Sequence, residues 1–195
     1  MTIPKDSDLA LKEWSLAVEA LAQGEQILIL RKGGIRETEK DFKVVHPEFL
    51  LYPTYEHQNN DLIKPQYSGQ FHESYTQNDP NGFISLDYWC QVTDKIEVRS
   101  EHILRNISPF HIWTDEYANK RLRWKPSQPL TVLFLKVYKL SETNTLRIRQ
   151  EYIGCKSWVN LMKDVNLSDI KPVLTDSEYL QQRSLIMQSI RMESQ

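Results

Sequence analysis

Short aliphatic segments, each ended by glycine, proline or polar residues, constrain the fold of this chain more than any other feature of its sequence. Residues 130–140 (LTVLFLKVYKL) follow two prolines and have the length and composition of a strand. Residues 26–31 (QILILR) form an aliphatic run that is too short for a helix. Two further segments, 48–52 (EFLLY) and 83–92 (FISLDYWCQV), are also predicted strands. The sequence therefore predicts a protein built around a β-sheet.

Helices are predicted at both ends of the chain. Apolar residues recur at helical spacing within residues 8–23, and Gly24 is positioned to cap the end of that helix. Near the C-terminus, Thr175 and Glu178 have the spacing of a capping box. They precede a predicted helix at about residues 176–192.

Short central helices are predicted over residues 100–106 and 114–121, because a serine and a threonine begin these segments as N-caps. The strands are expected to pair in antiparallel hairpins. Residues 26–45 form one such hairpin, and residues 145–153 return along residues 130–140. The predicted fold class is α+β: a mostly antiparallel sheet with an N-terminal helix, short central helices and a C-terminal helix.

Residues 1–160 are expected to form a single compact domain, with a mobile polar loop at about 66–82 and a C-terminal extension over 161–195. A chain of 195 residues can bury a core without disulfides or a metal. No apolar run approaches the ~20 residues of a membrane span, and the polar start lacks the pattern of a signal peptide. We therefore predict a cytoplasmic protein that neither enters a membrane nor requires a cofactor.

Charge is segregated along the chain although the net charge is only -2. Residues 46–94 carry one basic residue, Lys64, against seven acidic residues, whereas residues 95–139 carry nine basic residues against four acidic ones. The near-neutral total argues against a protein that coats polyanions generally, but it leaves room for a local basic patch.

A glycine pair surrounded by cations is the first candidate binding site. Gly33 and Gly34 free the backbone to approach a ligand, and Arg31, Lys32 and Arg36 would attract a phosphate or carboxylate. The glycine spacing matches neither a phosphate-binding P-loop nor a dinucleotide fingerprint. The alternative is a charged hairpin tip in which the glycines serve only the turn.

Aromatic and basic residues alternate over the second candidate site, in the manner of a surface that stacks bases and neutralises phosphates. The residues are Trp113, Tyr117, Lys120, Arg121, Arg123, Trp124 and Lys125. The alternative is that the aromatic rings belong to the core and the charged side chains lie across them.

Evidence for catalysis is weaker. Glu56, His57 and His111 are candidate acid–base residues, although adjacent residues in an extended chain point to opposite faces. The alternative for the Glu56–His57 pair is a surface turn. The histidines and the two cysteines lack metal-binding spacing, so no metal site is predicted.

Three blocks carry a resemblance to a known family: LKEWSLAVEALAQGEQILILRKGGIRE, FLLYPTYEHQ and PFHIWTDEYANKRLRWKPSQPLTVLFLKVYKL. From about Leu11 to Trp158 the chain resembles the bacterial family known as domain of unknown function 1802. The resemblance implies an association with restriction-endonuclease-like modules and hence a role near nucleic acid. It supplies no accepted catalytic residues to map onto this sequence.

The leading hypothesis is a non-catalytic or accessory nucleic-acid-binding domain, possessing phosphate contacts at both cation clusters and base stacking at the aromatic residues. One alternative is a small enzyme acting on a phosphorylated or nucleotide substrate, with Lys32 and Arg36 holding the anion and His57 or His111 moving a proton. Another is a protein-interaction module in which the acidic region 46–94 of one copy meets the basic region 95–139 of another. The sequence leaves the oligomeric state open.

Overall fold

One sheet of seven strands organises the described part of the chain, which in the computed structural model comprises residues 3–32, 46–55, 59–68, 82–154 and 156–192. The strands are β1 (Asp6–Trp14), β2 (Leu28–Arg31), β3 (Glu48–Thr54), β4 (Phe83–Val98), β5 (Leu130–Arg147), β6 (Trp158–Asn166) and β7 (Lys171–Pro172). The helices are α1 (Ser15–Ala22), α2 (Pro65–Ser68), α3 (Glu101–Ile107), α4 (Asp115–Arg123) and α5 (Asp176–Arg191). Three short 3₁₀ turns cover Asn60–Leu62, Ser108–Phe110 and Gln150–Tyr152.

The sheet has the order β2-β5-β4-β3-β1-β6, with β7 paired to β5. Its pairs are antiparallel except for β1 and β3, which run parallel from Ala10 opposite Leu50 to Trp14 opposite Thr54. These features confirm the predicted α+β class and its mostly antiparallel sheet.

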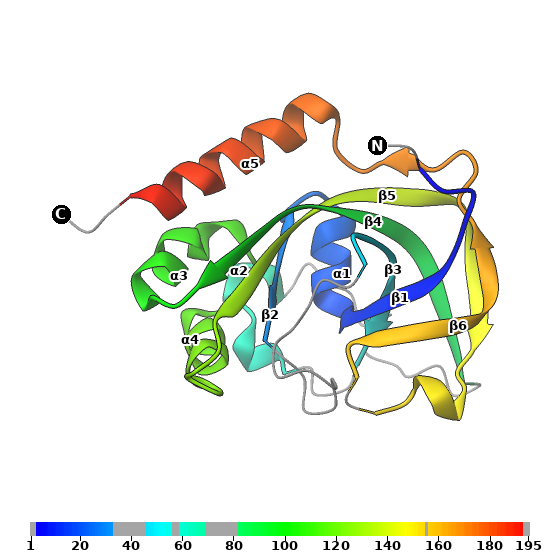
Figure 1. The fold of residues 1–195 in the computed structure, drawn as a ribbon, viewed down its shortest axis with the longest axis horizontal. Coiled ribbons are helices and arrows are strands. Elements are labelled where there is room, and N and C mark those ends of the chain that lie inside the picture. The colour runs from blue at the N-terminus through cyan, green and yellow to red at the C-terminus, as the bar shows by residue number, and fades with distance from the viewer. Residues whose placement is uncertain (1–2, 33–45, 56–58, 69–81, 155, 193–195) are drawn as a thin grey trace.

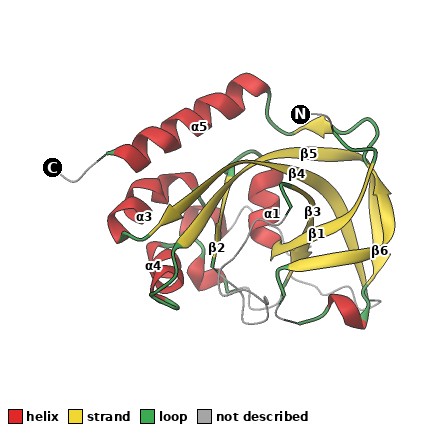
Figure 2. Cartoon of the chain, in the orientation of Figure 1, coloured by secondary structure: helices red, strands yellow, loops and turns green. Residues whose placement is uncertain are grey.

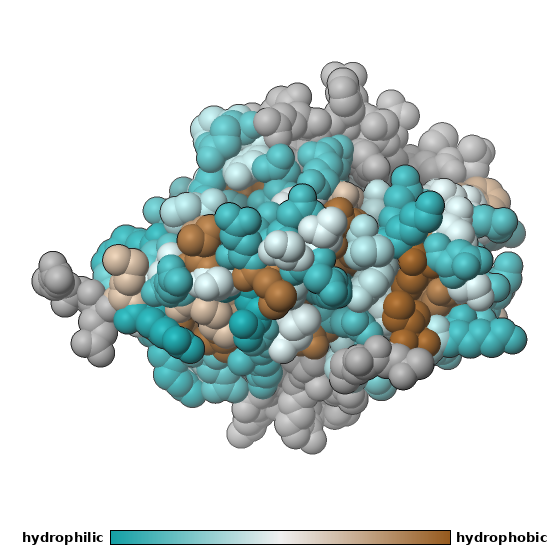
Figure 3. Space-filling view, turned by 90° about the horizontal axis from the view of Figure 1, so that it is seen from above, coloured by the Kyte–Doolittle hydropathy of each residue, from teal (hydrophilic) through white to brown (hydrophobic). Residues whose placement is uncertain are grey.

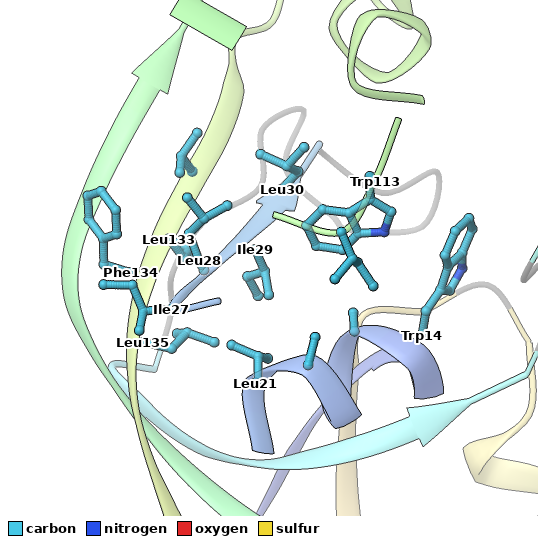
Figure 4. Close-up of a cluster of buried hydrophobic side chains, with 14 of the residues drawn as sticks. Trp14, Leu21, Ile27, Leu28, Ile29, Leu30, Trp113, Leu133, Phe134 and Leu135 are labelled. Carbon is cyan, nitrogen blue, oxygen red and sulfur yellow. The ribbon is translucent and has the colours of Figure 1, made fainter. Parts of the chain in front are cut away.

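The sheet curves around α1, so that each face of its strands covers a different core (Figure 1). Successive residues of β1 illustrate this, because Leu11 joins the core around α1 whereas Ala10 joins a second core near β6. In the larger core, side chains of β2 and β5 pack over α1 (Figure 4).

The predicted N-terminal helix exists but begins at Ser15 rather than at about Asp8. Residues 6–14 instead form β1, which pairs with β3 on one side and β6 on the other. Nearly all of the apolar residues that suggested a helix lie in α1. Gly24 follows this helix with a φ of 72°, the left-handed conformation expected of a C-terminal cap. Tertiary pairing decided the conformation of the residues before Ser15.

One of the two predicted hairpins is wrong, and the other lies partly outside the described residues. β5 continues through Arg147 and pairs along its length with β4, so residues 145–153 are not a hairpin partner of residues 130–140. β2 also pairs with β5, and the expected second strand of the 26–45 hairpin falls outside the described residues. Most of the predicted 66–82 loop falls outside them too.

Helices α3, α4 and α5 agree with the sequence, whereas α2 occupies the start of the segment predicted as a loop. Ser100 and Thr114 accept the N-cap hydrogen bonds of α3 and α4, and Thr175 and Glu178 form the predicted capping box of α5. α3 and α4 gather at one end of the sheet, and α5 lies along its outside near α3 (Figure 2). None of the described helices is long and apolar enough to cross a membrane.

The outer surface around α5 carries only small apolar patches. Leu180 and Leu185 are exposed on this helix, and Arg183 pairs with Asp94 of β4. Seen from the α5 side, hydrophobic residues are interrupted by hydrophilic ones (Figure 3). Scattered apolar residues of this kind do not by themselves mark a binding site.

Candidate nucleic-acid interface

The two cation clusters predicted from sequence meet where β2 ends against α4. The buried Lys32 amine donates hydrogen bonds to the carbonyl oxygens of Leu122 and Gln128, both at 2.7 Å. Burial lowers the pKa of this lysine, with a smaller contribution from Arg99. Lys32 therefore fixes the end of α4, because a cation satisfies carbonyl groups that the helix leaves open.

Arg31 forms a buried ion pair with Glu13 of β1. One guanidinium nitrogen lies 3.2 Å from Glu13 Oε2 and donates to the carbonyl oxygen of Lys12 at 3.1 Å. The exposed fractions of the Arg31 and Glu13 side chains are 11% and 4%. Glu13 Oε1 also accepts the backbone N–H of Trp14 at 2.9 Å. This pair joins the ends of β1 and β2.

Arg121 extends the same cluster from α4. Its Nε donates to the hydroxyl oxygen of Tyr117 at 3.0 Å, and its guanidinium lies 5.3 Å from the centre of that ring. Burial raises the pKa of Tyr117, and the charges of Arg121, Glu13 and Arg31 also act on it. The set of Glu13, Arg31, Tyr117 and Arg121 is called the α4 network below.

Two of the three aromatic residues predicted to stack on bases belong to the core. Trp113 is fully buried and its ring lies parallel to that of Tyr117, with 5.6 Å between the ring centres. Trp14 also packs against Tyr117, with 5.0 Å between the ring centres. Trp113 and Tyr117 are therefore core residues, as the alternative interpretation of this segment predicted. Trp124 is the aromatic residue of the segment that lies at the surface.

An exposed cationic edge lies at the end of α4. Trp124 is 38% exposed, and the Lys125 ammonium lies 4.7 Å from the centre of its ring. Arg123 pairs with Glu101 at 2.8 Å and Lys120 pairs with Glu116 at 2.5 Å, all with exposed side chains. We call the exposed residues Arg99, Lys120, Arg123 and Trp124, together with the half-buried Lys125, the α4 edge.

The ion pairs of the α4 edge leave its cations available to other anions. Pairs between exposed side chains contribute only about 0–1 kcal/mol, because water and salt screen them. A phosphate that approaches Arg123 or Lys120 therefore competes with a weak interaction.

His111 is enclosed in the core rather than placed in a site. It is 1% exposed, and neither ring nitrogen has a hydrogen-bond partner among the described residues. Burial, followed by the charge of Lys64, lowers the pKa of His111 to about 3. It is therefore neutral near pH 7 and out of contact with solvent. The other acid–base candidates, Glu56 and His57, lie outside the described residues, as do Gly33, Gly34 and Arg36.

The lowered pKa of His111 predicts that the protein loses stability on mild acidification. Between its ordinary pKa of 6.5 and the folded value of about 3, the unfolded chain binds a proton that the folded chain does not. Stability is fully present above that window and falls as the pH is lowered through it. Urea unfolding at about pH 7 and about pH 5 should show a lower free energy of unfolding at the acidic pH.

A non-titrating replacement isolates this contribution. His111→Gln should remove most of the difference between the two pH values, whatever it does to stability at pH 7. His102→Gln is the matched control, because His102 lies near the surface in hydrogen-bond distance of the Met192 carbonyl. An unchanged pH difference in His111→Gln would contradict the assignment.

Other chemistry finds little support in the described residues. The Cys90 thiol is buried, which raises its pKa well above the ordinary value and disfavours the thiolate. No group of three His, Cys, Asp or Glu side chains in the described ranges could hold a metal ion.

Comparison with known proteins assigns the chain to a family. A family model described as domain of unknown function (DUF1802) matches residues 10–184. The chain belongs to this family. The match confirms the resemblance seen in the sequence, and it reaches into α5, beyond the blocks that carried that resemblance. None of the curated proteins compared with this DUF1802 chain matches it.

Solved structures of an ASCH protein from Zymomonas mobilis are similar to the DUF1802 chain. The unmodified ASCH protein is 9% identical with a TM-score of 0.42, and the alignment covers 90% of this chain and 92% of that one. A point variant of it is 10% identical with a TM-score of 0.43, covering 94% and 99% of the two chains. A second variant is 9% identical with a TM-score of 0.43, covering 90% and 95%.

Two charged residues of the DUF1802 chain were not among the candidate site residues predicted from sequence. Lys12 and Glu13 are adjacent, both less than a tenth exposed, and they belong to a strand rather than to a helix surface. Because successive strand residues point to opposite faces, Glu13 enters the α4 network while Lys12 turns towards the second core. The alternation of Leu9 and Leu11 just before them is the sequence pattern that could have indicated this strand.

Proposed function

We propose that the protein is a nucleic-acid-binding domain that contacts single strands through the α4 edge. The observation that carries this proposal is the exposed Trp124 ring with the Lys125 ammonium beside it, in a region where cations outnumber acids. Bases stack on exposed aromatic rings irrespective of sequence, and neighbouring cations neutralise the phosphates. No step of chemistry is required for this function.

The buried interactions behind the edge support the proposal by making it rigid. Lys32 holds the Leu122 carbonyl of α4 and the Gln128 carbonyl beyond the helix, and the α4 network ties the helix to β1 and β2. A surface fixed in this way loses little conformational freedom when a strand binds. Arg31 and Lys32 thus serve the interface as supports rather than as direct phosphate contacts.

Variants of the α4 edge test the proposal through fluorescence anisotropy of a labelled single strand. Arg123→Glu combined with Lys125→Glu should weaken binding by about 10-fold or more, since each lost phosphate contact removes a counterion-release contribution. Trp124→Ala should weaken it by about 10-fold through the loss of stacking. The affinity should be measured at low salt for RNA and DNA strands.

Lys163→Glu provides the matched control. Lys163 is an exposed lysine of β6. The strand β6 lies across the molecule from α4 (Figure 1). Its reversal changes the net charge by the same amount per residue and should leave binding nearly unchanged. Equal weakening by Lys163→Glu would indicate attraction to the whole molecule instead of the α4 edge, and would count against the proposal.

No observation in the described residues supports the alternative of a small enzyme as the exposed Trp124 ring supports nucleic-acid binding. His111, one of its two acid–base candidates, is enclosed, and its pKa of about 3 leaves it neutral at ordinary pH. A candidate base must lie within hydrogen-bond reach of a substrate, which an enclosed ring does not.

A further inference from the structure

Glu101, the first residue of α3, holds the guanidinium of Arg123 at the α4 edge. Both Nε and Nη2 of Arg123 lie 2.8 Å from the same carboxylate oxygen, Oε1. The Arg123 side chain is 71% exposed and the Glu101 side chain is 38% exposed, so solvent reaches the pair. A guanidinium binds carboxylates and phosphates through the same fork of N–H donors. The carboxylate of Glu101 therefore occupies a position that suits a phosphate oxygen.

The orientation of α3 places Arg105 on the same side of the helix as that carboxylate. Arg105 follows Glu101 by four residues, a spacing that puts two side chains on one face of a helix. Another face of α3 belongs to the core, where Leu104 and Ile107 are buried. A third face carries Asn106, which donates hydrogen bonds to carbonyl oxygens at the end of α5. The exposed Arg105 thus lies on the side of α3 that adjoins α4 (Figure 2).

Positive charge exceeds negative charge around Glu101. Arg123 contacts its carboxylate, whereas the Arg105 side chain forms no ion pair with another described residue. Arg99, exposed just before α3, adds a third cation. One carboxylate therefore serves three guanidinium groups, and an exposed ion pair holds each partner only weakly. A phosphate of a bound strand is an anion that such a set of arginines attracts.

We propose that a strand bound at the α4 edge continues across α3, where one backbone phosphate displaces the Glu101 carboxylate and is held by Arg123 and Arg105. This inference rests on the proposed function and extends its binding surface to a second helix. Glu101 is then an internal competitor of the strand, because its carboxylate must leave Arg123 before the phosphate binds. Its charge lowers the affinity of the α4 edge for every strand.

Anisotropy of a labelled single strand of about 12 nucleotides, a length within the usual range of single-strand sites, tests the competition on the full chain. Glu101→Gln nearly preserves the size of the side chain and removes its charge. Binding should tighten by about 3-fold, the scale of one exposed ion pair. Glu142→Gln is the matched control, because Glu142 is an exposed acid far along β5 from α4, and it should leave the affinity nearly unchanged.

The contact with Arg105 is tested in the same assay. Arg105→Glu should weaken binding by about 10-fold and reduce its salt dependence, since one phosphate contact is lost. Arg147→Glu makes the same change of charge at an exposed residue in the last turn of the β5 sequence, and it should have little effect. The side chain of Arg105 is exposed, so the variant is expected to fold.

A double-variant cycle distinguishes displacement of the carboxylate from a general effect of its charge. In an Arg123→Gln background, Glu101→Gln should lose most of its tightening effect, because the competition is for the Arg123 guanidinium. If the tightening persists in full without Arg123, the Glu101 carboxylate does not occupy the phosphate position and the proposal is wrong.

The outcomes also separate this inference from the proposed function. The path across α3 is wrong if strands bind through Arg123 and Lys125 but Glu101→Gln leaves the affinity unchanged. It is also wrong if Arg105→Glu behaves like Arg147→Glu. In both cases the α4 edge would still bind strands. If the wild type binds no strand, the proposed function and this inference fail together.

Discussion

We expect Arg31→Leu to lower the free energy of unfolding by about 3–5 kcal/mol, the usual cost of breaking a buried ion pair by removing one partner. The variant leaves the Glu13 carboxylate at 4% exposure without the guanidinium that lies 3.2 Å away. A buried charge without its partner is costly because the interior solvates it poorly. Chemical denaturation at pH 7 measures the loss.

An exposed ion pair of α4 provides the control for this experiment. Glu116→Gln removes the partner of Lys120, and the loss should be at most about 0.5 kcal/mol because both side chains are exposed. The double variant Glu13→Leu with Arg31→Leu should recover much of the stability lost by Arg31→Leu alone, since no charge then remains buried. Equal effects of Arg31→Leu and Glu116→Gln would show that the buried pair does not hold β1 and β2 together.

We expect Trp113→Ala to lower the free energy of unfolding by about 3–5 kcal/mol, because it leaves a large cavity in a fully packed core. Trp113 has no exposed surface, and its ring packs against both Tyr117 and His111. Denaturant unfolding followed by circular dichroism gives the free energy.

Trp124→Ala is the companion variant, because its ring is 38% exposed rather than enclosed. It should change stability by less than about 1 kcal/mol and weaken binding of a single strand, as proposed above. We therefore expect stability to depend on Trp113 and strand binding on Trp124, although the two are close together in sequence. A near-neutral Trp113→Ala combined with lost binding would restore Trp113 as a stacking residue and contradict its assignment to the core.

The sequence could predict the elements whose cause is local. Capping boxes, N-caps and the glycine after α1 depend on hydrogen bonds within a few residues, and Thr175, Thr114 and Gly24 all behave accordingly. The segments of β2, β3, β4 and β5 were also visible, because β-branched and aliphatic residues ended at turn-forming residues, whereas most of β1 was predicted as helix and β6 was not predicted. Their partners were not, since the pairing of β5 with β4 and β2 depends on contacts between distant parts of the chain.

In the candidate site, too, the sequence could not predict the features that depend on contacts between distant residues. Sequence reasoning placed the cations near residues 31 and 121 in separate clusters, and only the curved sheet brings Arg31 and Arg121 to the same carboxylate. It could not tell Trp113 from Trp124, because both belong to the segment that interleaves aromatic and basic residues and only burial separates them. Lys12 was missed because a helix over residues 8–23 would have placed it on a solvated face.

The salt dependence of strand binding tests the central claim most directly. Anisotropy of labelled single-stranded RNA, single-stranded DNA and duplex DNA would be recorded at about 50 and about 200 mM salt. If about three phosphates contact the α4 edge, the affinity for single strands should fall by about 20-fold between these salt concentrations, and the charge-reversed variant should show a smaller fall. Absent binding, or binding that salt does not weaken, would contradict the account of this chain as a nucleic-acid-binding domain.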